Sequence, residues 1–323
     1  MTPADRAIVT LAVGNPVFVR FAVNLARSFL WWHRDGDIRF AIATDHPELL
    51  PADVQKAVEV ISLAPGQYGT GFTAKLWLDQ FAPARHTIFL DADCLIVGPL
   101  TGVFDSLAGR PVAVIGGSIS EGEWFGDVRQ ARSQLGVGAI PKFNGGLYYI
   151  ERGKTASAVY ATARELEPRY DALGLVRLRG KPNEELLMAL ALGSHGIEGV
   201  PEDGTIMAEP LNFATGLSLD VLRGTATLRN EQGHPRYQEK WPLRVAHPLV
   251  VHFLGYHTDR HPYTTEARRL ELVASGVSWR VAWWRALLTH ALPARIARSA
   301  RDLMRPIYHA AFGPRAVAPS NRG

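Results

Sequence analysis

The chain has 323 residues, of which 47% are hydrophobic, 20% charged and 9% aromatic. This length suits one large α/β domain or two ordinary ones, and the composition excludes a disordered or low-complexity chain. The single cysteine, Cys94, excludes an internal disulfide, so nothing points to an oxidising compartment. No apolar run reaches the roughly 18 to 20 residues of a membrane-spanning helix, and the N-terminus lacks a signal-peptide pattern. We therefore expect a cytoplasmic protein without a transmembrane span.

The formal net charge of +4 is unevenly distributed. Residues 277–323 contain eight arginines and one acid, Asp302, for a net charge of +7, so the preceding 276 residues carry −3. Local charge density decides which polyanion is attracted. We therefore expect the C-terminal segment to bind a negatively charged partner.

The N-terminal third predicts two β-α-β steps and hence a parallel sheet. Asn15 can cap a helix and Pro16 suits its first turn. The apolar run at 86–90 leads directly into Asp91-Ala92-Asp93, so two acids stand at the carboxyl end of a buried strand. The expected elements are strands at 7–13, 38–44, 58–63, 86–90 and 94–97 and helices at 16–29, 51–57 and 73–80.

The rest of the chain is less regular. Residues 116–138 are rich in glycine and are expected to form a functional loop, and residues 193–244 show no clear pattern. Asn183 is expected to cap the helix that follows. The remaining expected elements are strands at 111–115, 143–150 and 248–253, helices at 155–166 and 186–192, and a helical region from 277 broken by Pro293, Pro306 and Pro314.

Asp91 and Asp93 are the first candidates for chemistry. Paired carboxylates that leave a strand can face one crevice, and hard oxygen ligands suit Mg²⁺ or Mn²⁺ bound together with phosphate oxygens. In an open parallel sheet, ligands bind at the carboxyl ends of the strands. The alternative is a solvated turn, but the flanking residues are apolar and buried acids need a compensating cation.

Each of the other candidate groups could have either a functional or a purely structural role. His252 ends an apolar strand and could ligate Mn²⁺ or be structural. Lys75 could neutralise a phosphate or lie on a solvated helix face. Asn144 before Gly145-Gly146 could contact a sugar or only mark a bend. Glu184 and Glu185 could act on a sugar or simply stabilise a helix N-terminus.

The order and spacing of these motifs resemble the GT-A-fold glycosyltransferases, and glycosyltransferase family 8 in particular. The motifs, in chain order, are the first strand, Lys75, Asp91-Ala92-Asp93, Asn144-Gly145-Gly146, Asn183-Glu184-Glu185 and His252-Phe253-Leu254-Gly255. This resemblance covers about residues 7–258. It implies an α/β GT-A (nucleotide-diphospho-sugar transferase) fold, with a Rossmann-like, mainly parallel sheet, in a catalytic domain over 1–260. The remainder, 261–323, would be a C-terminal helical extension, basic and aromatic.

The resemblance also implies a function. It predicts a metal-dependent glycosyltransferase that moves a sugar from a nucleotide-diphosphate donor, UDP-linked in most of the family, to a glycan or lipid-linked acceptor with retention. Mn²⁺ or Mg²⁺ would be held by Asp91, Asp93 and His252, with Ala92 and Gly255 beside the ligand. Lys75 would face the diphosphate or donor sugar. The implied nucleotide contacts are Thr10, Ala12 and Asn15, and the implied sugar and acceptor contacts are Asn144 and Gly146, with Glu184 and Glu185 as catalytic candidates.

Two positions depart from the family pattern. A lysine expected six residues after His252 is replaced by Thr258, so one diphosphate contact is missing unless His257 or Arg260 substitutes. The family's Asp-Gln is replaced by Asn183-Glu184. Glu184 would steady the sugar cation in a retaining reaction, whereas Glu184 or Glu185 would be the base in an inverting one.

Rival functions are a degenerate GT-A-like module that binds a sugar nucleotide or glycan without transfer, and a nucleotidyltransferase. The second should carry a glycine-rich basic loop near its N-terminus, and none is present. In 277–323, tryptophans alternate with arginines, which suits an anionic membrane surface on the inner face. The alternative is a helix packed on the catalytic body, and no nucleic-acid partner is expected.

Overall fold

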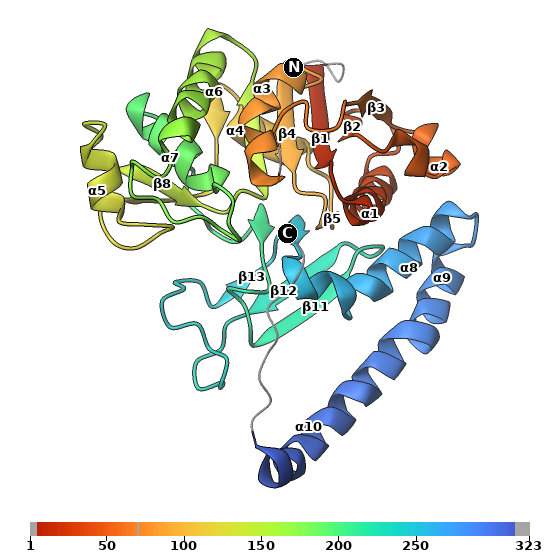
Figure 1. Ribbon diagram of the computed structural model, residues 1–323. Coiled ribbons are helices and arrows are strands. Elements are labelled where there is room, and N and C mark those ends of the chain that lie inside the picture. Colours follow the sequence, from red (N-terminus) through yellow and green to blue (C-terminus); the bar gives the residue numbers. More distant parts are fainter. Residues whose placement is uncertain (1–4, 70, 314–323) are drawn as a thin grey trace.

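A six-stranded sheet with the order β3-β2-β1-β4-β9-β6 forms the centre of the computed structural model, which describes residues 5–69 and 71–313 (Figure 1). The first four strands of this order pair in parallel, while β9 runs antiparallel to both β4 and β6. The predicted mainly parallel α/β sheet is therefore confirmed. Its strands are β1 (Arg6–Ala12), β2 (Arg39–Thr44), β3 (Glu59–Ser62), β4 (His86–Leu90), β6 (Val112–Ala113) and β9 (Leu147–Glu151).

Helices cover both faces of this sheet. Successive side chains of β1 point to opposite faces, so Ile8 packs in the core under α1 and Val9 packs in the core under α6 and α7. The predicted start of α1 is confirmed, because the Asn15 side chain accepts a hydrogen bond from the backbone N–H of Val17 and Pro16 occupies the first turn. The helices are α1 (Pro16–Trp32), α2 (Ala52–Gln55), α3 (Leu78–Phe81), α4 (Thr101–Leu107), α5 (Val128–Ser133), α6 (Lys154–Leu166) and α7 (Glu184–Ser194), with short 3-10 helices at Pro47–Leu49, Gly71–Trp77, Glu167–Arg169 and Gly255–Asp259.

A second, three-stranded sheet lies where β4 ends. Its order is β10-β14-β5, formed by β10 (Met207–Ala208), β14 (Val250–His252) and β5 (Cys94–Ile96). In its antiparallel pair, His252 lies opposite Cys94. This pairing brings the late histidine beside the two aspartates that follow β4.

Three sequence expectations are corrected by long-range pairing. The expected loop 116–138 contains β7 (Gly116–Ile119) and α5, and β7 pairs with β8 (Ile140–Phe143). The expected single strand 143–150 is two strands, β8 and β9, separated by the turn at 144–146. The patternless region 193–244 contains a hairpin of β11 (Gly216–Asp220) and β12 (Thr225–Arg229), which β13 (Val245–Ala246) joins.

The predicted C-terminal helical extension is present, but Pro306 does not break it. α8 (Tyr263–Ala274) is followed by α9 (Trp279–Ala286), a π-helical segment (Leu287–Ala291) and α10 (Leu292–Phe312), which runs through Pro306. α10 extends away from the central sheet and none of its residues is buried (Figure 1), so water can solvate the Asp302 carbonyl that loses its helical hydrogen bond at Pro306. The expected break at Pro314 lies outside the described residues.

Trp283 attaches α9 to the rest of the molecule. Its indole Nε1–H donates to Asp220 Oδ2 at 2.6 Å, and the guanidinium carbons of Arg223 and Arg269 lie 4.6 and 5.0 Å from its ring centroid. Arg269 also pairs with the buried carboxylate of Glu266 at 2.7 Å. α8, α9 and the β11–β12 hairpin therefore form one packed unit.

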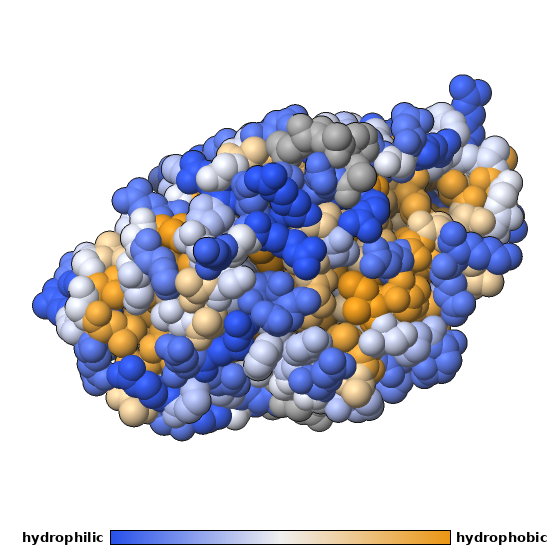
Figure 2. Space-filling model, turned by 90° about the horizontal axis from the view of Figure 1, so that it is seen from above, coloured by the Kyte–Doolittle hydropathy of each residue, from blue (hydrophilic) through white to orange (hydrophobic). Residues whose placement is uncertain are grey.

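Seen from above, the molecular surface is mainly hydrophilic, with apolar side chains gathered toward its two ends (Figure 2).

We expect Glu266 to make stability depend on pH. Burial raises the pKa of its carboxyl to about 7 against the opposing effect of Arg269, so between about pH 4.5 and 7 the folded chain keeps a proton that the unfolded chain has lost. The unfolding free energy of the wild type relative to Glu266→Gln should therefore fall as pH rises through this window, by up to about 3 kcal/mol, and stay level above it. Urea denaturation of both proteins from pH 4.5 to 8 measures this difference, and parallel profiles would contradict it.

Candidate active site

The turn after β4 brings Asp91 and Asp93 into a cluster of polar side chains at the carboxyl edge of the sheet, which is called the crevice below. The backbone N–H of Cys94 donates to the Asp91 carbonyl, which closes the turn, and the Asp91 N–H donates to the Gly146 carbonyl, which ties it to the turn at 144–146. Ala92 between the acids is buried. Both carboxylates keep about a fifth of their surface exposed, so they remain accessible to a ligand.

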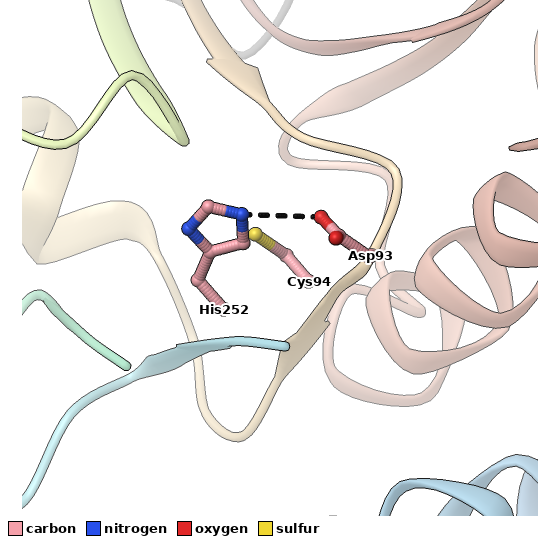
Figure 3. A group of neighbouring side chains, drawn as sticks. All are labelled: Asp93, Cys94 and His252. Carbon is pink, nitrogen blue, oxygen red and sulfur yellow. Dashed lines mark ion pairs between the residues drawn. The ribbon is translucent and has the colours of Figure 1, made fainter. Parts of the chain in front are cut away.

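His252 completes a cluster with these acids. Its Nε2 lies 3.1 Å from Asp93 Oδ1 and 3.6 Å from Asp91 Oδ2. Burial lowers the pKa of the imidazole, but the negative charges of Asp93 and Asp91 outweigh burial and raise it to about 9. Both ring nitrogens are buried, and neither has a hydrogen-bond partner of good geometry among the described residues. Figure 3 shows the ring of His252 and the side chains of Asp93 and Cys94 together, and one ligand atom from each lies within 4.8 Å of the others.

Lys75 is the cation at the centre of the site. Its Nζ lies 2.8 Å from Asp91 Oδ1 and 2.9 Å from Glu184 Oε1, and it donates to the Gly145 carbonyl at 3.0 Å. Burial lowers the pKa of this ammonium, but the two carboxylates outweigh burial and raise it above its ordinary value. Lys75 is therefore charged and has a partner for each of its three N–H groups.

Glu184 and Glu185 open α7, as predicted, after Asn183, whose side chain accepts from the Glu185 N–H at 2.8 Å. Glu184 is 1% exposed, and its Oε2 has no hydrogen-bond partner within the described structure. Glu185 Oε1 accepts from the Gly145 N–H at 2.7 Å. Burial, and then the charge of Glu184, raise the pKa of Glu185 to about 7.

The turn at 144–146 packs against both acids and histidine. A Cβ on Gly146 would lie 2.5 Å from His252 Nδ1, and a Cβ on Gly145 would lie 2.7 Å from Glu184 Oε1. Only glycine lets the backbone approach these groups so closely. The predicted site residues Lys75, Asp91, Asp93, Asn144, Gly146, Glu184, Glu185 and His252 therefore lie in one cluster.

Glu209 is a member of the cluster that sequence reasoning missed. It follows β10 in the region without a sequence pattern, and its Oε2 accepts from Asn144 Nδ2 at 2.8 Å. Burial raises the pKa of its carboxyl, while His252 acts to lower it. The only sequence signal was an acid after a short apolar pair, Met207-Ala208, which is too common to be informative.

Two of the residues implied for nucleotide binding, Thr10 and Ala12, lie on the strand beside the one that leads to the acids, because β1 pairs in parallel with β4 and Val9 stands opposite Phe89. Thr10 is buried within β1, and Ala12 accepts a hydrogen bond from Thr44 through its carbonyl. Asn15 uses its side-chain oxygen to cap α1, and Gly255 has a left-handed φ of 55° with open space around it. None of the four forms a hydrogen bond or ion pair with the acidic cluster in the described part of the chain.

The charges of the cluster fit a divalent cation. Asp91, Asp93, Glu184, Glu185 and Glu209 face Lys75 and His252, so carboxyl groups outnumber cationic groups. Buried negative charge needs compensation, and imidazole with carboxylates is a donor set that suits Mn²⁺. His252 counts as a cation only without a metal; a bound ion would displace its proton, and the imidazole, whose buried ring nitrogens have no hydrogen bond within the described residues, would then supply a further ligand atom.

No protein-family model and no curated protein sequence matches this chain. Among solved structures, the galactosyltransferase LgtC in complex with donor and acceptor sugar analogs is similar at a TM-score of 0.53 and 16% sequence identity, over 85% of this chain and 99% of that one. The chain has the GT-A fold of this glycosyltransferase. An active-site variant of LgtC with glutamine replaced by glutamate gives a TM-score of 0.52 at the same identity and coverage. The apo form of the glycosyltransferase GlyE from Streptococcus pneumoniae gives 0.50 at 14% identity, over 87% of this chain and 62% of that one.

We expect removal of Lys75 to destabilise the protein through the acids that it leaves behind. Lys75→Met should lower the free energy of unfolding by about 3 kcal/mol without added metal, because Asp91 and Glu184 lose their buried counter-ion. Adding Glu184→Gln to this variant should recover part of the loss, since one uncompensated carboxylate is removed. Urea denaturation measures both effects, with Lys142→Met at an exposed position as the control. Additive losses in the double variant would contradict the coupling.

Proposed function

We propose that the chain is a metal-dependent glycosyltransferase. It would transfer a sugar from a nucleotide-diphosphate donor, a UDP-sugar in the first instance, to a glycan or lipid-linked acceptor with retention of configuration. The observation that carries the proposal is the convergence of Asp91, Asp93 and His252 at the carboxyl end of β4, beside Lys75, in a GT-A fold. In α/β sheets this edge is where ligands bind.

Asp91, Asp93 and His252 would hold Mn²⁺ or Mg²⁺ in this proposal, with Ala92 and Gly255 leaving room beside them. The ion, when bound, supplies positive charge for the departing diphosphate. Thr10, Ala12 and Asn15, at the β1–α1 connection, would hold the nucleotide. Within the described structure, neither candidate for the missing lysine forms a hydrogen bond or ion pair with the acids. Arg260 stacks on Tyr256, and burial followed by Arg260 lowers the pKa of His257.

Lys75 would hold Asp91 and Glu184 in place and face the donor from its buried position. Glu184 has a buried Oε2 without a hydrogen-bond partner among the described residues, and a carboxylate beside the donor would stabilise positive charge on the sugar. Glu185 would be the proton-accepting group if the acceptor hydroxyl needs one, since its pKa of about 7 matches such a task. Asn144 and Gly146 would line the donor-sugar and acceptor side.

Nucleotide binding provides the direct test. Wild-type protein should bind one of UDP, GDP, ADP and CDP in the presence of Mn²⁺ and lose at least tenfold in affinity without the metal or in Asp93→Ala, because Asp93 is one of the proposed ligands. Asp171→Ala removes a surface aspartate paired with Arg177 and serves as the matched control. Isothermal calorimetry measures these affinities. If none of the nucleotides binds, the degenerate module is favoured. If one binds, hydrolysis of the donor without an acceptor distinguishes a transferase from a module that only binds.

We also propose that α10 lies on an anionic membrane surface, peripherally on the inner face. Ile296, Ala300, Leu303 and Ile307 follow each other at intervals of four, three and four residues and form an exposed apolar stripe. The same spacing shifted by two residues gives a polar face of Arg298, Asp302, Arg305 and His309.

No residue of α10 is buried against the described remainder of the chain, whereas α9 buries Ala282 and Ala286. α9 therefore packs on the catalytic body, as one of the two alternatives for 277–323 states, and the membrane proposal concerns α10 alone. An amphipathic helix with arginines on its polar face suits the interface of anionic lipids. No helix within 5–69 and 71–313 has the length and apolarity to cross a bilayer.

Leu303→Glu should weaken binding to vesicles that contain anionic lipid by about tenfold or more, because it places a charge in the apolar stripe. His309→Glu introduces the same negative charge on the polar face and should have a smaller effect. Co-sedimentation with vesicles of phosphatidylcholine and phosphatidylglycerol measures both. Equal losses in the two variants would indicate attraction by charge alone, and no binding by the wild type would overturn the proposal.

A further inference from the structure

We infer that Glu209 is a positioning residue that fixes the side-chain amide of Asn144 for the sugar substrates. This inference rests on the proposed transferase function of the same crevice. Glu209 Oε2 accepts from Asn144 Nδ2 at 2.8 Å, and Glu209 Oε1 accepts from Asn212 Nδ2 at 2.6 Å. On its other side, Asn144 Oδ1 accepts from the Gly146 N–H at 2.8 Å.

These contacts leave Asn144 one orientation. A carboxylate only accepts hydrogen bonds and a backbone N–H only donates them, so the amide nitrogen must face Glu209 and the amide oxygen must face Gly146. The reversed amide would set oxygen against carboxylate and N–H against N–H. One N–H of the Asn144 amide then remains for a ligand, and a sugar hydroxyl oxygen is the acceptor that suits it.

The fold places Glu209 at this point through the small sheet. β10 and β14 pair in parallel with Ala208 opposite Val251, so Glu209 and His252 are the next residues of the two strands. His252 in turn contacts the turn at 144–146 closely enough to exclude a side chain on Gly146. Glu209, His252 and Asn144 therefore belong to one packed group.

Glu209 differs in role from the acids proposed as metal ligands. Both of its oxygens already accept from side-chain amides at short distances, whereas Asp93 faces His252 with its carboxylate partly exposed. Glu209 therefore acts through Asn144 and has no direct contact with the metal or the donor. A residue of this kind is expected to change how the substrate is held once Asn144 is free to turn.

A double-mutant cycle in kcat/KM tests the inference. Glu209→Ala and Asn144→Ala should each lower kcat/KM by about 10- to 100-fold. The double variant should match Asn144→Ala within about twofold, because Glu209 acts only through that amide. Glu209→Gln keeps one acceptor oxygen and should recover part of the loss. Glu202→Gln changes a neighbouring, partly buried carboxyl that the inference does not involve; it is the control and should stay within about twofold of the wild type.

Additive losses in the cycle would overturn the inference and assign Glu209 a separate role in stability or binding. Crystal structures of the wild type and Glu209→Ala provide a readout that does not depend on activity. The Asn144 side chain should leave the Gly146 N–H in the variant, and an unmoved Asn144 would also overturn the inference. If no donor is turned over by the wild type while Asn144 moves as expected, the proposed function fails and the positioning role of Glu209 stands.

Discussion

The site depends on one buried ammonium group. Lys75 holds Asp91 from the end of β4, Glu184 from the start of α7 and the Gly145 carbonyl from the turn between β8 and β9. Largely buried charged groups are costly unless they are paired, so the position of each segment is constrained by the same three N–H groups. The side chain of Lys75 is therefore as much a structural element of the crevice as a candidate for its chemistry.

Local signals in the sequence predicted those parts of the fold that local physics determines. Asn15 and Asn183 cap α1 and α7 because a side-chain oxygen satisfies an N–H that the helix leaves free, and this requirement is visible in a few neighbouring residues. Asp91 and Asp93 were recognised because acids directly after a buried strand are costly without a cation. The order of such signals along the chain was enough for the GT-A fold.

Features that depend on distant partners could not be predicted in the same way. β7 pairs with β8 across the segment taken for a loop, and neither strand has an alternating pattern of its own. The role of Glu209 depends on two distant contacts, the pairing of β10 with β14 and the hydrogen bond from Asn144 in the turn at 144–146. Pro306 lies within α10, where the exposure of the helix leaves the carbonyl of the preceding turn open to water, and this exposure is a property of the surroundings that the sequence near the proline does not reveal.

The structure also shows where the unevenly distributed charges of the chain lie. Carboxylates gather around Lys75 and His252, where their charge favours a cation, and the excess of arginines continues along the exposed surface of α10. Trp283, held between Arg223 and Arg269, is the point at which the basic extension becomes attached to the acidic body. Arg223 and Arg269 share one aromatic ring there, and the carboxylate of Asp220 lies 3.8 Å from the first and 3.5 Å from the second, which offsets their mutual repulsion. The attachment of α9 thus resembles the cluster around Lys75, because in both places a carboxylate and a cation from distant segments of the chain hold those segments together.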